Sequence, residues 1–215
     1  MRGWGAFLAA VLALLVLPAT ALAARAEIRR TAHGIPHITA KDYRGIGFGY
    51  GYAFAQDNIC PIAEQYVTVN AQRSRWFGAD GSYELRGNGF EANNLNSDFF
   101  WQQIIDSGIV DELLQRDPPI GPKPAIRAGV RGYVAGYNRY LRDIGGTENV
   151  PDESCRGEPW VRPITQKDAF LRFYQLTLLA SQAVAVDGIG APGAGGCAAP
   201  MPSIATPELA SSASW

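Results

Sequence analysis

Histidine is scarce in this 215-residue chain, and its scarcity excludes several kinds of active site. The two histidines, His33 and His37, lie four residues apart, but Gly34 and Pro36 disfavour the helix that would present both to one metal ion. No acidic or cysteine ligand lies beside them. The chain also contains no Gly-x-Ser-x-Gly segment, the turn that exposes a serine nucleophile. The sequence therefore predicts neither a metal site nor a self-contained serine triad.

An excess of basic residues is also absent. The chain has 19 lysines and arginines against 20 aspartates and glutamates, which gives a net charge of −1. A protein that binds a nucleic acid backbone generally carries a positive field. We therefore expect no nucleic acid partner.

The chain has no apolar run long enough for a typical membrane span, but residues 1–23 have the form of a secretory signal. Arg2 provides a basic start, residues 6–17 are uncharged and apolar, and Ala21-Leu22-Ala23 has the small-x-small form of a cleavage site. The apolar run is shorter than the roughly 20 residues that a bilayer core requires. We therefore expect a secreted or periplasmic protein with no membrane anchor after cleavage.

Glycine, by contrast, is plentiful, and residues 45–51 read GIGFGYG. This segment lacks the glycine spacing and the preceding strand of a dinucleotide site. It also fits a membrane-dimer motif, but charged residues bracket too short an apolar run. Because Gly47, Gly51 and Ala55 recur every four residues, they form one stripe on a helix. The spacing predicts close packing between helices.

The remaining pattern predicts a hairpin followed by helices. The polar triplet Gln56-Asp57-Asn58 should mark a junction at which Asp57 or Asn58 caps the second of two helices. Ser97-Asp98 is expected to cap a helix whose apolar face includes Phe99. The expected elements are a hairpin over 27–40, helices over 43–56, 61–77, 99–116, 124–144 and 165–185, and a Gly/Ala/Pro/Ser-rich linker over 187–215.

The three cysteines permit one disulfide and leave one residue over. Export would place them in an oxidising compartment. Cys60 and Cys155 lie in sequence that is predicted to fold, whereas Cys197 lies in the predicted linker. The odd number also allows a partner cysteine on another chain.

Five motifs, taken in order, resemble the N-terminal part of the penicillin acylase family of N-terminal-nucleophile amidohydrolases. The resemblance implies an α+β fold, a four-layer αββα sandwich in which residues 24–186 supply a mainly helical α-chain portion. The variants AQDNIC, NSDFF and CRGEPWVRP are similar to acylases of acyl-homoserine lactones and cyclic lipopeptides, and in that branch Cys60 and Cys155 would suit a disulfide. The five motifs are IRRTAHGIPHITA, DYRGIGFGYGYAFAQDN, AQRSRWFG, IRAGVRGYVAGYNRYL and EPWVRPITQKD.

This resemblance implies hydrolysis of the amide bond of an N-acyl substrate: an acyl-homoserine lactone, a lipopeptide or a penicillin. The family's nucleophile is a serine that becomes the first residue of a β chain once a linker is cut from one precursor, and its own amine acts as the base. That serine precedes an asparagine or similar residue, and none of Ser203, Ser211, Ser212 and Ser214 precedes an asparagine.

We therefore expect no catalytic residue in this chain, which is either truncated or encoded apart from its β-chain partner. The chain alone should be inactive. The alternative is a secreted helical binding protein without catalysis, or a decayed acylase remnant.

The resemblance also implies substrate contacts on the last helix. Phe173, Leu176, Leu179 and Ala180 would lie on one apolar face, although ordinary core packing would explain the same face. Some family members bind a structural calcium through an α-chain glutamate in this segment. No glutamate lies between Pro159 and Ala205, so no cofactor is expected.

Overall fold

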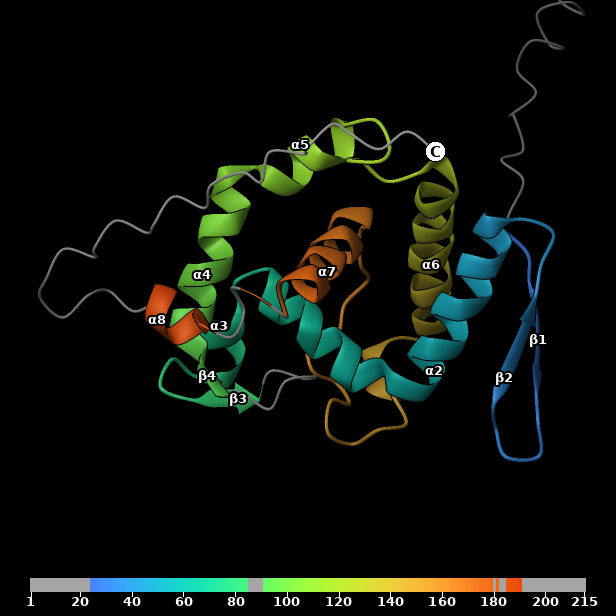
Figure 1. Ribbon diagram of the computed structural model, residues 1–215. Helices are drawn as coiled ribbons and strands as arrows, with labels where there is room; N and C mark the ends of the chain where they lie inside the picture. Colours follow the sequence, from blue (N-terminus) through green and yellow to red (C-terminus); the bar gives the residue numbers. More distant parts are fainter. Residues whose placement is uncertain (1–23, 85–90, 180, 182–184, 191–215) are drawn as a thin grey trace, which may run out of the picture.

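The computed structural model describes residues 24–84, 91–179, 181 and 185–190, and within them it is mainly helical (Figure 1). The predicted signal over 1–23 lies outside these residues, as does the predicted linker beyond residue 190. No described helix is both long and apolar enough to cross a bilayer. In chain order the elements are β1 (Glu27–Arg30), β2 (Pro36–Thr39), α2 (Tyr43–Val69), α3 (Arg73–Phe77), β3 (Ser82–Glu84), β4 (Glu91–Asn93), α4 (Asn94–Ser107), α5 (Ile109–Gln115), α6 (Pro124–Asp143), η1 (Thr147–Asn149), α7 (Gln166–Leu178) and α8 (Val186–Gly190).

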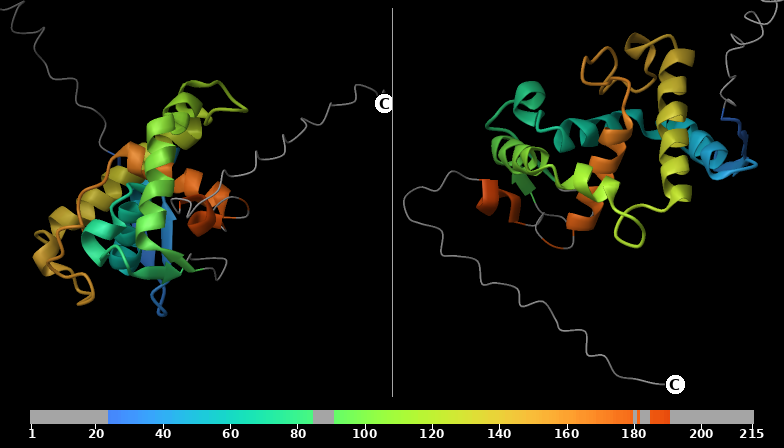
Figure 2. Two further views of the ribbon diagram at one scale, coloured as in Figure 1. Left: turned by 90° about the vertical axis from the view of Figure 1, so that its left-hand side faces the viewer. Right: turned by 90° about the horizontal axis from the view of Figure 1, so that it is seen from above.

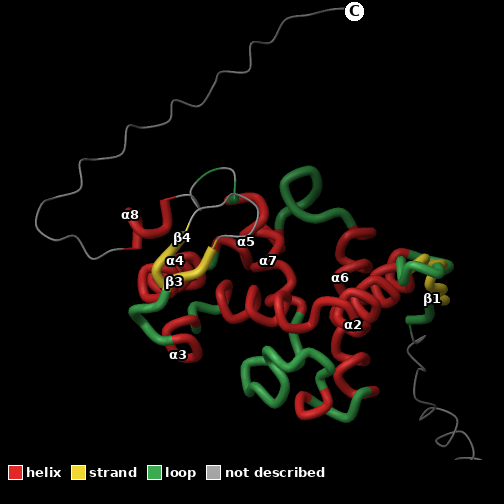
Figure 3. The backbone as a smooth tube through the Cα atoms, turned by 90° about the horizontal axis from the view of Figure 1, so that it is seen from below, coloured by secondary structure: helices red, strands yellow, loops and turns green. Residues whose placement is uncertain are grey.

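The helices surround α7, and the two small sheets lie at opposite ends of the described molecule (Figures 1 and 3). β1 and β2 form the predicted antiparallel hairpin, which packs against the first half of α2. α2 and α6 make the most extensive contact between helices, and α7 contacts both of them (Figure 2). The described part of the chain therefore contains no large sheet of the kind that the predicted sandwich requires.

The first half of α2 carries two glycine stripes, and each stripe faces a different neighbour. A Cβ on Gly49 would lie 2.5 Å from Cγ2 of Ile38 in the hairpin. A Cβ on Gly51 would lie 2.1 Å from the carbonyl oxygen of Tyr133 in α6, and one on Gly136 would lie 2.0 Å from the carbonyl oxygen of Phe48. Only glycine permits such close approach of two backbones. The predicted tight packing is confirmed, and it operates on two sides of the helix.

The junction predicted at Gln56-Asp57-Asn58 is a kink within one helical run. Asn58 has non-helical angles of φ −142° and ψ 34°, and α2 then continues to Val69. Of the two predicted caps, Asp57 instead pairs its carboxylate with Arg30 of the hairpin at 2.9 Å, whereas Asn58 is the residue at the break itself. Gln56 also accepts a hydrogen bond from Arg30, at 2.8 Å. Two neighbouring polar side chains therefore fasten the hairpin to the kink.

The predicted start of the next long helix is also wrong. Asn93, not Ser97-Asp98, caps α4, and its side chain accepts from the backbone N–H groups of Leu95 and Asn96. Asp98 instead accepts from the first backbone N–H groups of α3, which satisfies donors that a helix start leaves open. Phe99 is 51% exposed, because its neighbours Phe100 and Trp101 take the core-facing side of the helix.

Helical structure extends into the start of the predicted linker. Val186 is buried, and Asp187 accepts from the backbone N–H of Asn93 and from the side-chain amide of Asn96. These contacts hold α8 against α4. Composition alone did not reveal them, because they depend on residues about 90 positions earlier in the chain.

Candidate functional site

A groove between α2, α6 and α7 is the candidate functional site, with a cavity volume of about 450 Å³. Its size falls within the usual range of small-molecule sites. Its lining is apolar apart from tyrosine hydroxyls and one charged residue, and it includes no carboxylate. We call it the α2–α6–α7 groove. The lining residues are Tyr43, Ile46, Gly47, Tyr50, Phe54, Ile62 and Tyr66 of α2, Ala125, Ile126, Gly129, Val130 and Tyr133 of α6, and Ala169, Arg172, Phe173 and Leu176 of α7.

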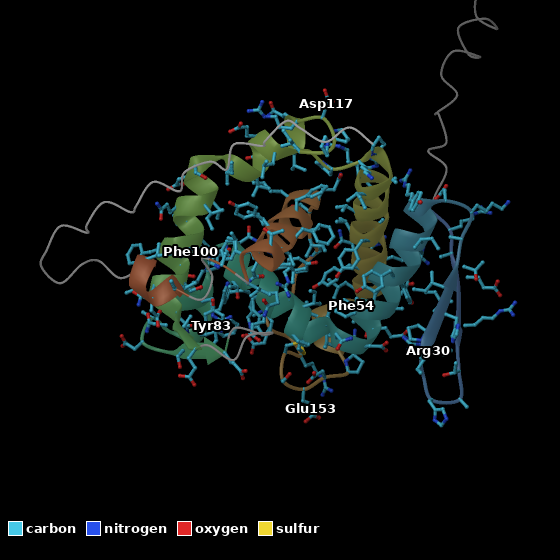
Figure 4. The ribbon with its side chains drawn as sticks, viewed as in Figure 1. Arg30, Phe54, Tyr83, Phe100, Asp117 and Glu153 are labelled. Atoms are coloured by element: carbon cyan, nitrogen blue, oxygen red, sulfur yellow. A yellow bond between two sulfur atoms is a disulfide. The ribbon has the colours of Figure 1, made fainter. Side chains whose placement is uncertain are left out.

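The local structure of α2 explains why aromatic side chains reach the groove. Glycines occupy the two faces that pack on the hairpin and on α6, so the bulky residues between them project from a third face. Ile46, Tyr50 and Phe54 are spaced four apart and form that face. The Tyr50 and Phe54 rings stack with their centroids 5.5 Å apart. Figure 4 labels Phe54 in the space bounded by α2, α6 and α7.

The rim of the groove exposes large apolar side chains together. Exposed apolar side chains are ordinary when they are scattered singly, but a contiguous group marks a binding surface. Here they come from all three helices and converge on one opening. The exposed lining residues, between 41% and 65% accessible, are Tyr43, Ile46, Tyr50, Ile126, Phe173 and Leu176.

The polar part of the lining includes a hydrogen-bonded pair of tyrosines and one arginine. The Tyr66 hydroxyl donates to the Tyr133 hydroxyl at 3.4 Å. Burial raises the pKa of both phenols, and that of Tyr133 rises to about 12, so both are protonated at neutral pH. The positive charge of Arg172, which also lines the groove, acts in the opposite direction on the pKa of Tyr133.

The predicted substrate-contact residues divide between the groove and the core. Phe173 and Leu176 line the groove. Leu179 is partly buried and packs against the hydrophobic core instead. Ala180 lies outside the described residues. The prediction missed the contributions of α2 and α6, although the four-residue spacing of Ile46, Tyr50 and Phe54 was visible in the sequence.

The other residues considered at the sequence level lie away from the groove. His33 and His37 are exposed on the hairpin. Cys60 and Cys155 form a disulfide with a Cα–Cα distance of 5.5 Å, and it joins α2 to the loop after η1. Among the residues that the structure describes, no group of three or more histidine, cysteine or acidic side chains is arranged to hold a metal ion.

Arg73 is a buried cation with an evident structural role. It donates to the side chains of Asn94, Thr68 and Glu64 at 2.8 to 2.9 Å. Its guanidinium also lies 3.6 Å from the centroid of the Tyr83 ring. These partners account for its burial without a ligand.

Comparison with known proteins identifies relatives over nearly all of the described chain. The family model described as penicillin amidase matches residues 25–187. The chain is 41% identical over 166 residues to aculeacin-A acylase of Actinoplanes utahensis, which covers 76% of this chain and 20% of that protein. It is 46% identical over 145 residues to acyl-homoserine lactone acylase PvdQ of Pseudomonas fluorescens, which covers 67% of this chain and 17% of that protein.

A solved structure shares the fold. The thermostable penicillin G acylase from Alcaligenes faecalis superposes with a TM-score of 0.54 and 22% identity, over 74% of each chain. At that identity the likeness concerns the fold alone. The present chain spans about a fifth of the length of the curated relatives that it matches.

Proposed function

Because the chain belongs to the penicillin amidase family, we propose that it is the α portion of an exported acylase that hydrolyses the amide bond of an N-acyl substrate. The observation that carries this proposal is the family match over residues 25–187. The relatives above 40% identity are named for aculeacin A and for acyl-homoserine lactones, which favours an N-acyl lactone or a lipopeptide as the substrate.

The chemistry of this proposal requires a second polypeptide. A serine at the N-terminus of a β chain attacks the amide carbonyl, and the α-amine of that serine takes its proton. Donors on the β chain stabilise the tetrahedral oxyanion. In this arrangement residues 1–23 are the signal, residues 24–186 the α-chain region, and residues 187–215 the linker. The two chains together form the four-layer sandwich.

The contribution proposed for this chain is contact with the acyl group. Phe173 and Leu176 are nearly half exposed and lie in the apolar groove, so an acyl chain placed there would remove their surface from water. The proposed contact does not extend to Leu179, which packs against the core. No catalytic residue is assigned to the described part of this chain.

Acyl-amide turnover by the complete two-chain protein tests the proposal. The complete protein should release homoserine lactone or the lipopeptide nucleus from its N-acyl form, whereas the 215-residue chain alone should not. Phe173→Ala and Leu176→Ala should raise the KM for a long-chain substrate several-fold. Phe99→Ala, which removes an equally exposed phenylalanine outside the groove, should leave the KM unchanged. Turnover by the 215-residue chain alone would show that the nucleophile lies in this chain and not on a β chain.

A non-catalytic binding protein is the second candidate, because the groove is formed by this chain without any partner. The coding DNA separates the two possibilities. A β-chain sequence after the codon for Trp215, or in a neighbouring gene, supports the acylase. A stop codon with no such gene nearby supports the binding protein.

A further inference from the structure

The hairpin of β1 and β2 has backbone groups on one edge that no described residue uses. Thr31 donates its backbone N–H to the Ile35 carbonyl oxygen at 3.1 Å. Because bonded and non-bonded pairs alternate along an antiparallel pair, Arg29 belongs to the next bonded pair, and Ile28 and Arg30 lie at non-bonded positions. The N–H and C=O groups of Ile28 and Arg30 therefore point away from β2, and they make no further backbone hydrogen bond within the described chain. The outer edge of β1 thus offers two donors and two acceptors.

The edge of β2 is less suited to pairing. Pro36 lies opposite Arg30 and has no N–H to donate, so Ile38 provides the one outward donor of this strand. Proline on an edge strand opposes pairing with a further strand. β2 also makes the more extensive contact with α2, and Figure 1 shows β1 as the outer strand of the hairpin. A further strand can therefore pair with β1 more readily than with β2.

Contacts within this chain already hold the edge of β1 in place. The Arg30 side chain donates to the Gly34 carbonyl oxygen at 2.7 Å, which closes the hairpin. It also joins the hairpin to α2, through Gln56 at 2.8 Å and Asp57 at 2.9 Å. An isolated two-stranded hairpin is only marginally stable in water. Because these contacts order β1 in advance, pairing with a further strand costs less conformational entropy.

The hairpin is covered on one face only. Ile28 and Ile38 face α2, where a Cβ on Gly49 would lie 3.7 Å and 2.5 Å from them respectively. The opposite face is exposed and mostly polar, which is typical of an antiparallel sheet with one face in solvent. A strand beside β1 would therefore extend a sheet that this chain has begun. The exposed residues of the open face are Glu27, Arg29, Ile35, His37 and Thr39.

We propose that the edge of β1 pairs with a strand of the β chain, which bonds to the backbone groups of Ile28 and Arg30 and places the hairpin at the margin of a larger sheet. The interface rests on the proposed function, because it requires that second polypeptide. The chain spans about a fifth of the length of its curated relatives, and the described part contains no sheet of more than two strands. The remaining strands of the proposed sandwich come from the β chain, and β1 has the edge that can join them.

Amide hydrogen exchange, resolved to single residues, tests this pairing. The complete two-chain protein is compared with the 215-residue chain alone, its Cys60–Cys155 disulfide intact. The amides of Ile28 and Arg30 should exchange about tenfold or more slowly in the complete protein, because each would then donate to the partner strand. The Arg29 amide, which pairs with β2, is the internal reference and should be protected in both samples. Equal exchange of the Ile28 and Arg30 amides in the two samples would overturn the proposal.

A matched pair of variants tests the edge by a second route. Ile28 and Ile38 lie opposite each other and face the same glycine of α2, and the alternation leaves both N–H groups unbonded within the hairpin. Ile28→Pro removes a donor from the proposed interface and should weaken the association of the two chains about fivefold or more, the usual effect of one lost hydrogen bond. Ile38→Pro removes the same side chain and a donor on the opposite edge, so it controls for lost packing. Dissociation of the complete protein on dilution measures both, and equal affinities of the two variants would contradict the pairing.

These measurements do not depend on turnover. A complete protein that hydrolyses amides but leaves Ile28 and Arg30 unprotected refutes the interface and retains the proposed function. One that protects these amides without turnover retains the interface and refutes the hydrolysis. A dimer of the 215-residue chain with a protected Ile28 amide would show that a second copy occupies the edge. That result would overturn the proposal, as would a locus that encodes no β chain.

Discussion

At the scale of single residues, Asp168 shows how a buried carboxylate can organise a helix start. It is 3% exposed and forms a capping box with Thr165 at the beginning of α7. Its oxygens also accept from Arg162 at 3.0 and 3.2 Å and from Asn70 at 2.7 Å. Burial opposes ionisation, but the hydrogen bonds from Arg162 and Thr165 outweigh it and lower the pKa of Asp168. The carboxylate therefore joins α2, α7 and the loop before α7.

This lowered pKa predicts an acid-sensitive contribution to stability. A carboxyl whose folded-state pKa lies below its unfolded value, near 3.9, contributes stability that is present above that value and is lost as the pH falls towards the folded pKa. The unfolding free energy of the native protein, measured in urea, should therefore fall below about pH 4. Asp168→Asn should be less stable at pH 7 and should lose less stability between pH 5 and pH 2.

The control for this prediction is Asp106→Asn on the exposed side of α4, which should retain the native pH profile. A native profile in Asp168→Asn would show that other carboxylates carry the acid sensitivity.

At the scale of elements, the glycines of α2 determine which elements pack closely against this helix. The hairpin packs against Gly45 and Gly49, while α6 packs against Gly47 and Gly51. Because the two pairs are offset by two residues, they face different directions around the helix. Any side chain added on either face must displace a backbone or a packed neighbour.

Gly51→Ala should therefore destabilise the protein by about 3 kcal/mol, at the upper end of the usual cost of overpacking, because the new Cβ would lie 2.1 Å from the Tyr133 carbonyl oxygen. Gly129→Ala is the matched control in α6, since its Cβ would meet only an ordinary contact at 3.7 Å. Helix propensity favours alanine over glycine, so this control should be neutral or stabilising by up to about 1 kcal/mol. Denaturant midpoints measure both effects, and equal values for the two variants would refute the packing argument.

The elements also show which features could be predicted from the sequence. The glycine stripe on α2 and the hairpin were predicted, because each is set by spacing within a few residues. The partner of Asp57 was not, because Arg30 is brought to it by tertiary packing. A shared apolar face on α7 was predicted, and two of its residues, Phe173 and Leu176, line the groove. Its α2 and α6 walls depend on how the helices pack against one another, which local periodicity does not specify.

At the scale of the whole molecule, the Cys60–Cys155 disulfide ties the first half of the chain to the second. The bond spans 95 residues, and both cysteines are buried. Closing so long a loop reduces the conformational freedom of the unfolded chain. The connection also fixes the part of α2 that directly follows its kink relative to the loop that leads to α7.

Removing this bond should cost a large part of the molecule's stability. The double variant Cys60→Ala/Cys155→Ala is expected to lose about 4 kcal/mol of unfolding free energy, as measured in urea under non-reducing conditions. Cys197→Ala removes the thiol outside the bond and should leave the unfolding free energy unchanged. Identical midpoints for the native chain and the double variant would show that the bond contributes nothing to the folded state.

The position of this disulfide also has a consequence for biosynthesis. Cys60 is synthesised 95 residues before Cys155, an interval of roughly 5 to 20 s at ordinary rates of translation. Cys197 follows later still. Among the three cysteines of this sequence, the first two to coexist on the growing chain are therefore the native pair. In any oxidising compartment that the growing chain enters, this order favours the native bond, because Cys60 and Cys155 are both present before the third thiol of this sequence has been made.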